Sequence, residues 1–138
     1  MTTPPVTLRS PADLLAVVPH LLGFEPRQSI IVVAIRVNKI GLSQRIDLPE
    51  HERVEEVSHA ILRHVIRDAA KAALLVGYEE FAGESLPLIE AITARLKQRD
   101  VAVRDRIVVH EGRWRSLDCV EAFCCPPGGS PLPSCQWP

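Results

Sequence analysis

Four cysteines near the C-terminus are the first group of residues that could do chemistry. Cys119 and Cys124 are separated by four residues, a spacing at which two thiolates can reach one Zn²⁺, and Cys135 or His110 could complete a tetrahedral set. Cys125 directly follows Cys124, and neighbouring side chains of an extended chain point to opposite faces, which disfavours both binding one ion. The pattern predicts either a zinc site at Cys119, Cys124 and Cys135 or reduced thiols that act as small hydrophobic residues.

Cationic residues form a second group, in the last two predicted strands. With Glu111 and Gly112 as a two-residue hairpin loop, side-chain alternation places five of them on one face: Arg104, Arg106, His110, Arg113 and Arg115. The apolar residues of the same strands then face the core: Val103, Ile107, Val109 and Trp114. The cationic face could bind a phosphate group, a nucleic-acid backbone or an acidic partner. Alternatively, it is the charged outer face of an edge hairpin, which prevents pairing with other chains.

Carboxylates form a third group, after two predicted strands. Asp47 and Glu50 follow one strand, and Glu79, Glu80 and Glu84 follow another. Ligand sites of open sheets lie beyond the carboxyl ends of the strands, so these groups could converge on a divalent ion, with catalytic roles for Asp47, Glu79 and Glu80. The alternative is that Asp47, Glu50 and Glu84 stabilise helix N-termini.

Composition narrows the classes of protein. The 138 residues are 46% hydrophobic and 24% charged, with a formal net charge of -1. These values indicate one globular domain without a general attraction to nucleic acid or acidic membranes. The sequence has no apolar run of membrane-spanning length and no signal peptide, so a cytosolic location is expected. It also lacks the glycine-rich phosphate-binding and dinucleotide-binding motifs and the serine nucleophile motif.

Hydrophobic periodicity predicts the elements that must position these groups. A capped helix begins at Ser10 and ends near Val18, before Pro19. Further elements follow in the order strand, strand, helix, strand, helix, strand, strand: 29–36, 40–48, 49–70, 71–77, 83–99, 101–109 and 112–116. The fold class is therefore α/β, a mixed sheet of about five strands with helices packed on it. Residues 1–125 form one domain, and the Cys/Pro/Gly-rich residues 126–138 form an irregular tail.

Two hairpin loops, at Asn38-Lys39 and Glu111-Gly112, fix the expected register. They predict four cross-strand pairs: Arg45 with Val32, Asp47 with Ile30, His110 with Arg113, and Val108 with Arg115. The helix over 49–70 has one apolar stripe: Val54, Val57, Ile61, Val65 and Ala69. Its charged residues are expected in solvent: Glu55, Glu56, His59, Arg63 and Arg67. The helix over 83–99 turns Leu88 or Ile89, Ile92 and Leu96 inward, and Arg95, Lys97 and Arg99 outward.

Several strings occur together and in order along the chain: LRSPADLLAVVPHLLGFEP, SIIVVAIR, GLSQRIDLP, ALLVGYE, HEGRWRS and CCPP. With them the chain resembles the family catalogued as domain of unknown function 4192. Two residues depart from its pattern, Glu111 where Asp is usual and Arg115 where an aromatic residue is usual. The resemblance implies an origin in actinobacteria or their phages, and no activity or cofactor. Many relatives continue into a longer helix-rich region, so one interpretation is that this chain is a minimal or truncated version.

These observations favour a non-enzymatic cytosolic domain that binds a protein partner. The partner could be another copy of the chain in a homo-oligomer, and no membrane association is expected. The cationic face would be its binding surface, for an anionic ligand or partner. The alternative is a metal-dependent enzyme that acts on a phosphate-containing substrate through the carboxylates.

Overall fold

A computed structural model of the protein describes Leu15 and residues 27–36, 39–118 and 130–131. The described elements, in chain order, are these: β1 (Ser29–Arg36), β2 (Lys39–Asp47), the 3-10 turn η1 (His51–Arg53), α2 (Val54–Arg67), β3 (Ala72–Glu79), α3 (Leu86–Gln98), β4 (Ala102–His110), β5 (Arg113–Ser116) and β6 (Ser130–Pro131). The predicted helix over 10–18 lies outside the described residues, apart from Leu15.

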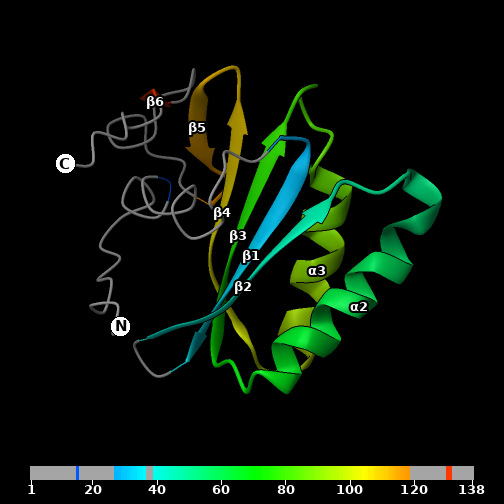
Figure 1. The fold of residues 1–138 in the computed structure, drawn as a ribbon, viewed down its shortest axis with the longest axis vertical. Helices are drawn as coiled ribbons and strands as arrows, with labels where there is room; N and C mark the ends of the chain where they lie inside the picture. The colour runs from blue at the N-terminus through cyan, green and yellow to red at the C-terminus, as the bar shows by residue number, and fades with distance from the viewer. Residues whose placement is uncertain (1–14, 16–26, 37–38, 119–129, 132–138) are drawn as a thin grey trace, which may run out of the picture.

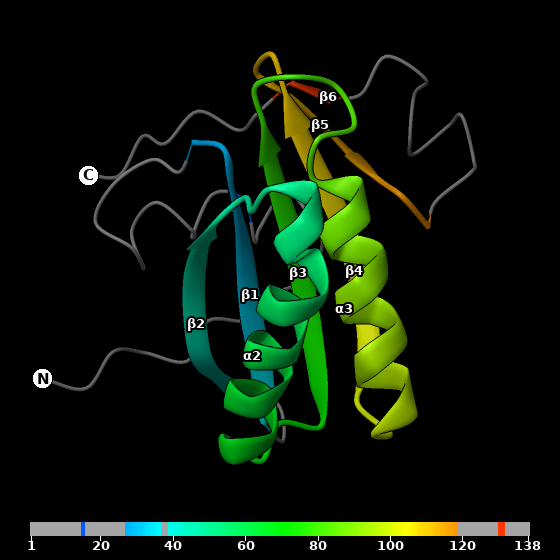
Figure 2. The same ribbon diagram turned by 90° about the vertical axis from the view of Figure 1, so that its right-hand side faces the viewer.

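The strands form one mixed sheet in the order β2-β1-β3-β4-β5-β6. Only β3 and β4 are parallel neighbours, and the other adjacent strands are antiparallel. The helices α2 and α3 pack side by side on one face of the sheet (Figures 1 and 2). The predicted α/β class, with about five strands and helices packed on a mixed sheet, is confirmed, and the short β6 is an addition.

The central strands β1 and β3 are apolar on both faces, and this explains their position. Every residue of β3 is buried, as is every residue of β1 except Arg36. Alternate residues of β1 belong to two clusters: Ile30, Val32 and Ala34 pack beneath the helices, while Ile31, Val33 and Ile35 lie on the opposite face with Leu15. Such a strand is stable only between two others in a sheet that is covered on both sides.

The apolar stripes of both helices face the sheet. In α2 the buried residues are Val54, Ser58, Ile61, Leu62 and Val65. Val57 is only half-buried, and Ala69 is exposed because the helix ends at Arg67 and Ala69 adopts a positive φ of 55°. The charged residues predicted in solvent on α2 are all exposed. In α3 the predicted inward residues, Leu88, Ile89, Ile92 and Leu96, are all buried.

The two helices are joined by a polar contact that the helical pattern did not predict. Arg95 of α3 is half-buried rather than directed into solvent. Its Nε donates to Ser58 Oγ at 2.8 Å, and its Nη2 lies 2.7 Å from Glu55 Oε2. Ser58 is fully buried, and its hydroxyl both accepts this hydrogen bond and donates to the backbone oxygen of Glu55 at 2.9 Å, so Arg95 joins α3 to a hydroxyl group already held in α2.

The predicted register of β1 and β2 is wrong by one residue. Arg45 lies opposite Ile31 and Asp47 opposite Ser29, and the pairing shifts between Val33 and Ile35. At that shift, residues 41 and 42 of β2 stand opposite a single residue of β1, which is a β-bulge. A shift of one residue moves every side chain to the other face, so Arg45 and Asp47 lie on the face opposite the helices.

A second irregularity, in β4, corrects the predicted orientation of Val103. Ala73 pairs with Val103 and Leu74 with Asp105, so Arg104 is an extra residue in this strand. Alternation is broken there: Val103 packs beneath the helices, whereas Ile107 and Val109 belong to the cluster on the opposite face. All three are apolar contacts of the core, but they do not share one face as predicted.

Candidate functional site: the strand-end surface

The C-terminal ends of β2, β3 and β4 point to the same edge of the sheet, because β1 is antiparallel to both β2 and β3 and β4 is parallel to β3. Both helices also begin at this edge, which lies along the top of Figure 1. We call it the strand-end surface. It is formed by residues 49–54 before and at the start of α2, by the β3–α3 loop at 80–85, and by the tip of the β4–β5 hairpin at 110–113.

Glu79, the last residue of β3, is a structural brace. Its Oε1 accepts the backbone N–H of Gly83 at 2.9 Å. Its Oε2 accepts the backbone N–H of Ser85 at 2.9 Å and the hydroxyl of Ser85 at 2.6 Å. These donors surround the N-terminus of α3, the position where an α/β protein can hold a phosphate group, so a carboxylate of the chain itself occupies it. The sequence pattern did not reveal this role.

Glu84 braces the same loop from the other side. Its Oε1 accepts the backbone N–H groups of Glu80 and of Phe81, the latter at 3.2 Å. Its Oε2 lies 3.5 Å from Gln28 Nε2, just before β1. The two glutamates therefore fix most of the backbone of the β3–α3 loop.

The predicted catalytic carboxylates are not brought together. Asp47 and Tyr78 both lie opposite Ser29, so they share its face, the one away from the helices. Glu79 follows Tyr78 and points to the helix face, where it contacts Ser85. Asp47 forms an ion pair with Arg45 at 2.7 Å, and Glu80 is exposed. Within the described residues, no three His, Cys, Asp or Glu side chains are placed to hold a metal ion. The predicted zinc ligands Cys119, Cys124 and Cys135 lie outside the described residues.

The β4–β5 hairpin has the predicted register. His110 pairs with Arg113, Val109 with Trp114 and Val108 with Arg115. Val108 packs beneath the helices, so the residues that alternate with it share the helix side of the sheet: Arg106, His110, Arg113 and Arg115. Trp114 packs against the cluster on the opposite face, as expected for a core residue. Arg104 does not belong to this regular set, because it lies at the bulge.

Arg106 is neutralised by two carboxylates. Its Nη1 lies 3.1 Å from Glu90 Oε1 of α3, and its Nη2 lies 2.7 Å from Asp118 Oδ1. The hydrogen bonds to Asp118 raise the pKa of Arg106, and the same bonds lower the pKa of Asp118. Of the predicted cationic face, the exposed arginines are therefore Arg104, Arg113 and Arg115, and Arg106 serves to join β4 to α3.

The Arg106–Asp118 pair predicts a small pH dependence. Because the pKa of Asp118 is lowered by folding, the pair stabilises the protein above the ordinary aspartate pKa of about 4, and this stability is lost as the pH falls through the folded pKa. Asp118 is about half exposed, so the contribution is at most about 1 kcal/mol. We expect Asp118→Asn to lose less stability than the wild type between pH 6 and pH 3 in urea unfolding. Equal losses in the two proteins would contradict this assignment.

His110 joins the hairpin to the β3–α3 loop. Its Nε2 lies 3.2 Å from the backbone oxygen of Glu80, and with a proton on Nε2 it donates to that oxygen. The next residue, Phe81, is 66% exposed, the most exposed large hydrophobic side chain in the described part of the chain. The sequence analysis missed Phe81. A possible signal was an aromatic residue inside the acidic loop sequence EEFAGE.

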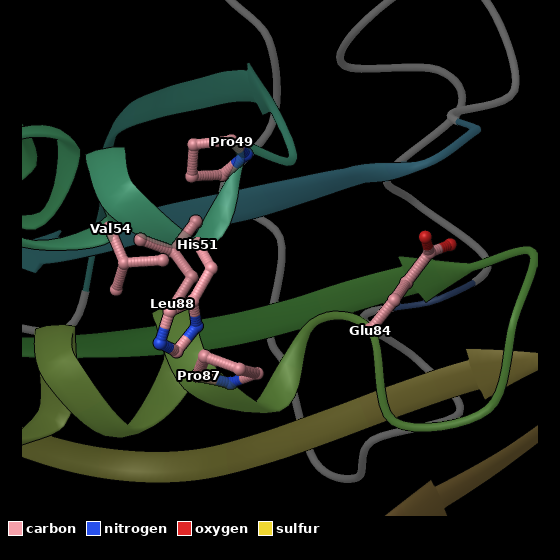
Figure 3. A pocket seen from close by; sticks show the side chains of 6 residues that line it. All are labelled: Pro49, His51, Val54, Glu84, Pro87 and Leu88. Carbon is pink, nitrogen blue, oxygen red and sulfur yellow. The ribbon is translucent and has the colours of Figure 1, made fainter.

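A hollow of about 90 Å³ lies beside this loop, between the starts of α2 and α3. It is lined by Pro49, His51, Val54, Glu84, Pro87 and Leu88. In Figure 3 the ring of His51 lies near Pro87 and Leu88, whereas the carboxylate of Glu84 extends away from the other side chains. The lining therefore combines apolar side chains with the polar groups of His51 and Glu84. Its size suits part of a side chain rather than a cofactor.

No helix in the described part of the chain is long and apolar enough to cross a membrane.

Comparison with known proteins identifies a family and no activity. No curated protein matches the chain. Residues 11–136 match the family described as domain of unknown function (DUF4192). Because this match covers nearly the whole chain, the protein belongs to the DUF4192 family.

Proposed function

We propose that this protein is a non-enzymatic, cytosolic protein-binding domain and that the strand-end surface is where its partner docks. The observation that carries this proposal is the exposed Phe81 side chain on a loop whose backbone is fixed on both sides. An exposed aromatic residue on a fixed loop can bury its ring in a partner without first ordering the backbone, which is how binding hot spots achieve most of their affinity.

The cationic residues of the hairpin supply specificity around this anchor. Arg113 and Arg115 are exposed on the helix side of β5, and Arg113 lies opposite His110, whose ring reaches the Phe81 loop. We expect carboxylates of the partner to face these guanidinium groups, with Arg104 further along β4. The metal-dependent alternative has no comparable support in the described residues, since Glu79 is engaged with its own loop and Asp47 lies on the other face of the sheet.

Replacing Phe81 with alanine tests the proposal. The full chain, immobilised and exposed to lysate of its host, should retain at least about tenfold less of each specific partner when it carries Phe81→Ala, because a buried phenyl ring contributes on the order of 2 kcal/mol. Partners captured by the wild type and its variants are compared by quantitative mass spectrometry. Partner capture should also decline as the salt concentration rises, because salt screens the attraction between these exposed arginines and the carboxylates of the partner.

Ile66 provides the matched control. It is the other large hydrophobic residue that is exposed in the described part of the chain, and it lies near the far end of α2. Ile66→Ala should retain the same partners as the wild type. If Phe81→Ala also leaves them unchanged, or if Ile66→Ala removes them equally, the strand-end surface is not the docking site.

A further inference from the structure

The edge of the sheet opposite the strand-end surface carries a cluster of exposed positive charge. Both helices end at this edge, where β1 also ends and where β3 and β4 begin (Figures 1 and 2). The N–H of Lys71 donates to the backbone oxygen of Ile35 at 2.9 Å, and the N–H of Ala102 donates to that of Lys71 at 3.2 Å, so these strand ends lie side by side. We call six exposed residues of this edge the cationic edge: Arg36, Arg63, Arg67, Lys71, Lys97 and Arg99.

Few acidic groups accompany these six cations. Within 63–71 and 97–102 the carboxylates are those of Asp68, which is half-buried, and Asp100, which is exposed. None of the six cations forms an ion pair with another described residue. Exposed glutamates gather instead at the strand-end surface, at Glu50, Glu52, Glu80 and Glu111. The net charge of -1 therefore conceals a local positive field at the cationic edge.

A role in stability accounts for only part of this cluster. Arg67 and Lys97 lie in the last turns of α2 and α3, where a cation stabilises the helix dipole. Arg36 and Lys71 lie at strand ends, where the dipole is small. Arg63 and Arg67 are four residues apart on one helix, a spacing at which like charges repel and destabilise the fold. Such repulsion is relieved when an anion binds.

We propose that the cationic edge binds the phosphate backbone of double-stranded DNA, in addition to the docking of a protein at the strand-end surface. Four of its six cations are arginines, whose planar guanidinium groups form paired hydrogen bonds with phosphate oxygens. The cations come from both helices and from two strands, so they suit a ligand with many phosphate groups rather than a single one. Binding would be independent of base sequence, because phosphate contacts carry no sequence information.

The composition of this edge favours double-stranded DNA over other anionic ligands. Protein interfaces and membrane-surface helices bury several large apolar side chains, whereas Ile66 is the large hydrophobic residue exposed near this end of α2. Single strands stack their bases on aromatic rings, and 63–71 and 97–102 contain no Phe, Tyr or Trp. Duplex RNA is bound partly through its 2′-hydroxyl groups, and Gln98 is the one amide or hydroxyl side chain in these two stretches.

Fluorescence anisotropy of a labelled DNA duplex of mixed sequence, titrated with the purified full chain, tests the inference. We expect binding at low salt, with an association constant that falls as salt rises, at a logarithmic slope of about −4 to −5. Arg67→Ala and Arg99→Ala should each weaken binding about threefold at low salt and bring the slope closer to zero by about one.

Arg27 provides the matched control. It is exposed and precedes β1 at the opposite edge, beside Gln28, whose side chain lies 3.5 Å from Glu84. Arg27→Ala removes the same charge and should change neither the affinity for DNA nor the slope. Circular dichroism of each variant should match the wild type, so that weaker binding cannot result from unfolding.

A chain that does not bind the duplex at low salt overturns the inference. An equal loss in Arg27→Ala and Arg67→Ala also overturns it, because binding would then depend on overall charge and not on this edge. Tighter binding of the single strand, of a duplex RNA of the same sequence or of phosphatidylserine vesicles would show that the ligand is not duplex DNA. The proposed function fails or stands separately, since its test replaces Phe81 and measures capture of a protein.

Discussion

Replacing Gly77 with alanine is expected to lower the free energy of unfolding by about 3 kcal/mol, the upper end of the range for overpacking a core. A Cβ atom at this position would lie 2.3 Å from Ser85 Oγ and 2.6 Å from Ser85 Cβ. Ser85 is fully buried at the start of α3, so it cannot move away without shifting the helix. The displaced hydroxyl would also lose its hydrogen bond to Glu79. Urea unfolding with linear extrapolation measures the change.

Gly112 is the matched control for Gly77. It has a positive φ of 73°, and a Cβ atom there would have no neighbour within 4 Å. Gly112→Ala should cost about 1 kcal/mol, the backbone strain of a left-handed residue without any clash. If Gly77→Ala destabilises the protein no more than Gly112→Ala, α3 does not pack as closely on β3 as the structure shows.

Replacing Glu79 with alanine should lower the free energy of unfolding by a similar amount, about 3 kcal/mol. The substitution removes the acceptor of three hydrogen bonds, and two of its donors belong to Ser85, which is buried. Donors left without an acceptor in a buried site are costly. We also expect the β3–α3 loop to lose its fixed conformation, which would show as faster amide exchange at Gly83 and Ser85.

Glu80 is the control for Glu79. It is the next residue along the chain and is exposed, so Glu80→Ala should change stability by less than about 0.5 kcal/mol. The stability of Glu79→Gln should lie between those of the two alanine variants. Its amide keeps one acceptor oxygen, but it replaces the other oxygen with an NH₂ group, which is itself a donor and cannot accept from the donors of the loop. Equal stability of Glu79→Ala and Glu80→Ala would show that the carboxylate does not brace the loop.

Most of the fold could be predicted from the sequence because the positions that are apolar in each helix or strand are also the positions that are buried. The run from Ser29 to Ile35 has β-branched or apolar residues at nearly every position, which is typical of a strand covered on both faces. What the sequence did not predict was the register of β2 against β1 and the face on which Val103 lies. The bulge of β2 opposite Ala34 and the bulge of β4 at Arg104 each add one residue to one strand, and a pattern with a period of two does not indicate such an insertion.

The candidate site was predicted less well, because its residues act through contacts that only the fold creates. Glu79 looked like a metal ligand in a row of acids, whereas its neighbours in space are the donors at the start of α3. In the sequence Arg106 is one of five similar cationic residues, whereas in the fold it forms ion pairs with Glu90 and Asp118. Phe81 could be any loop residue in the sequence, and only its exposure on a braced loop distinguishes it.

Photo-crosslinking from position 81 tests most directly whether the strand-end surface is the binding surface. The full chain would carry p-benzoylphenylalanine, a photoreactive analogue of phenylalanine, in place of Phe81, or of Ile66 in a control. We expect position 81 to form crosslinks to a bound protein partner and position 66 to form none. Crosslinking that is equal from both positions, or that is missing from position 81 while a complex is present, would contradict the account.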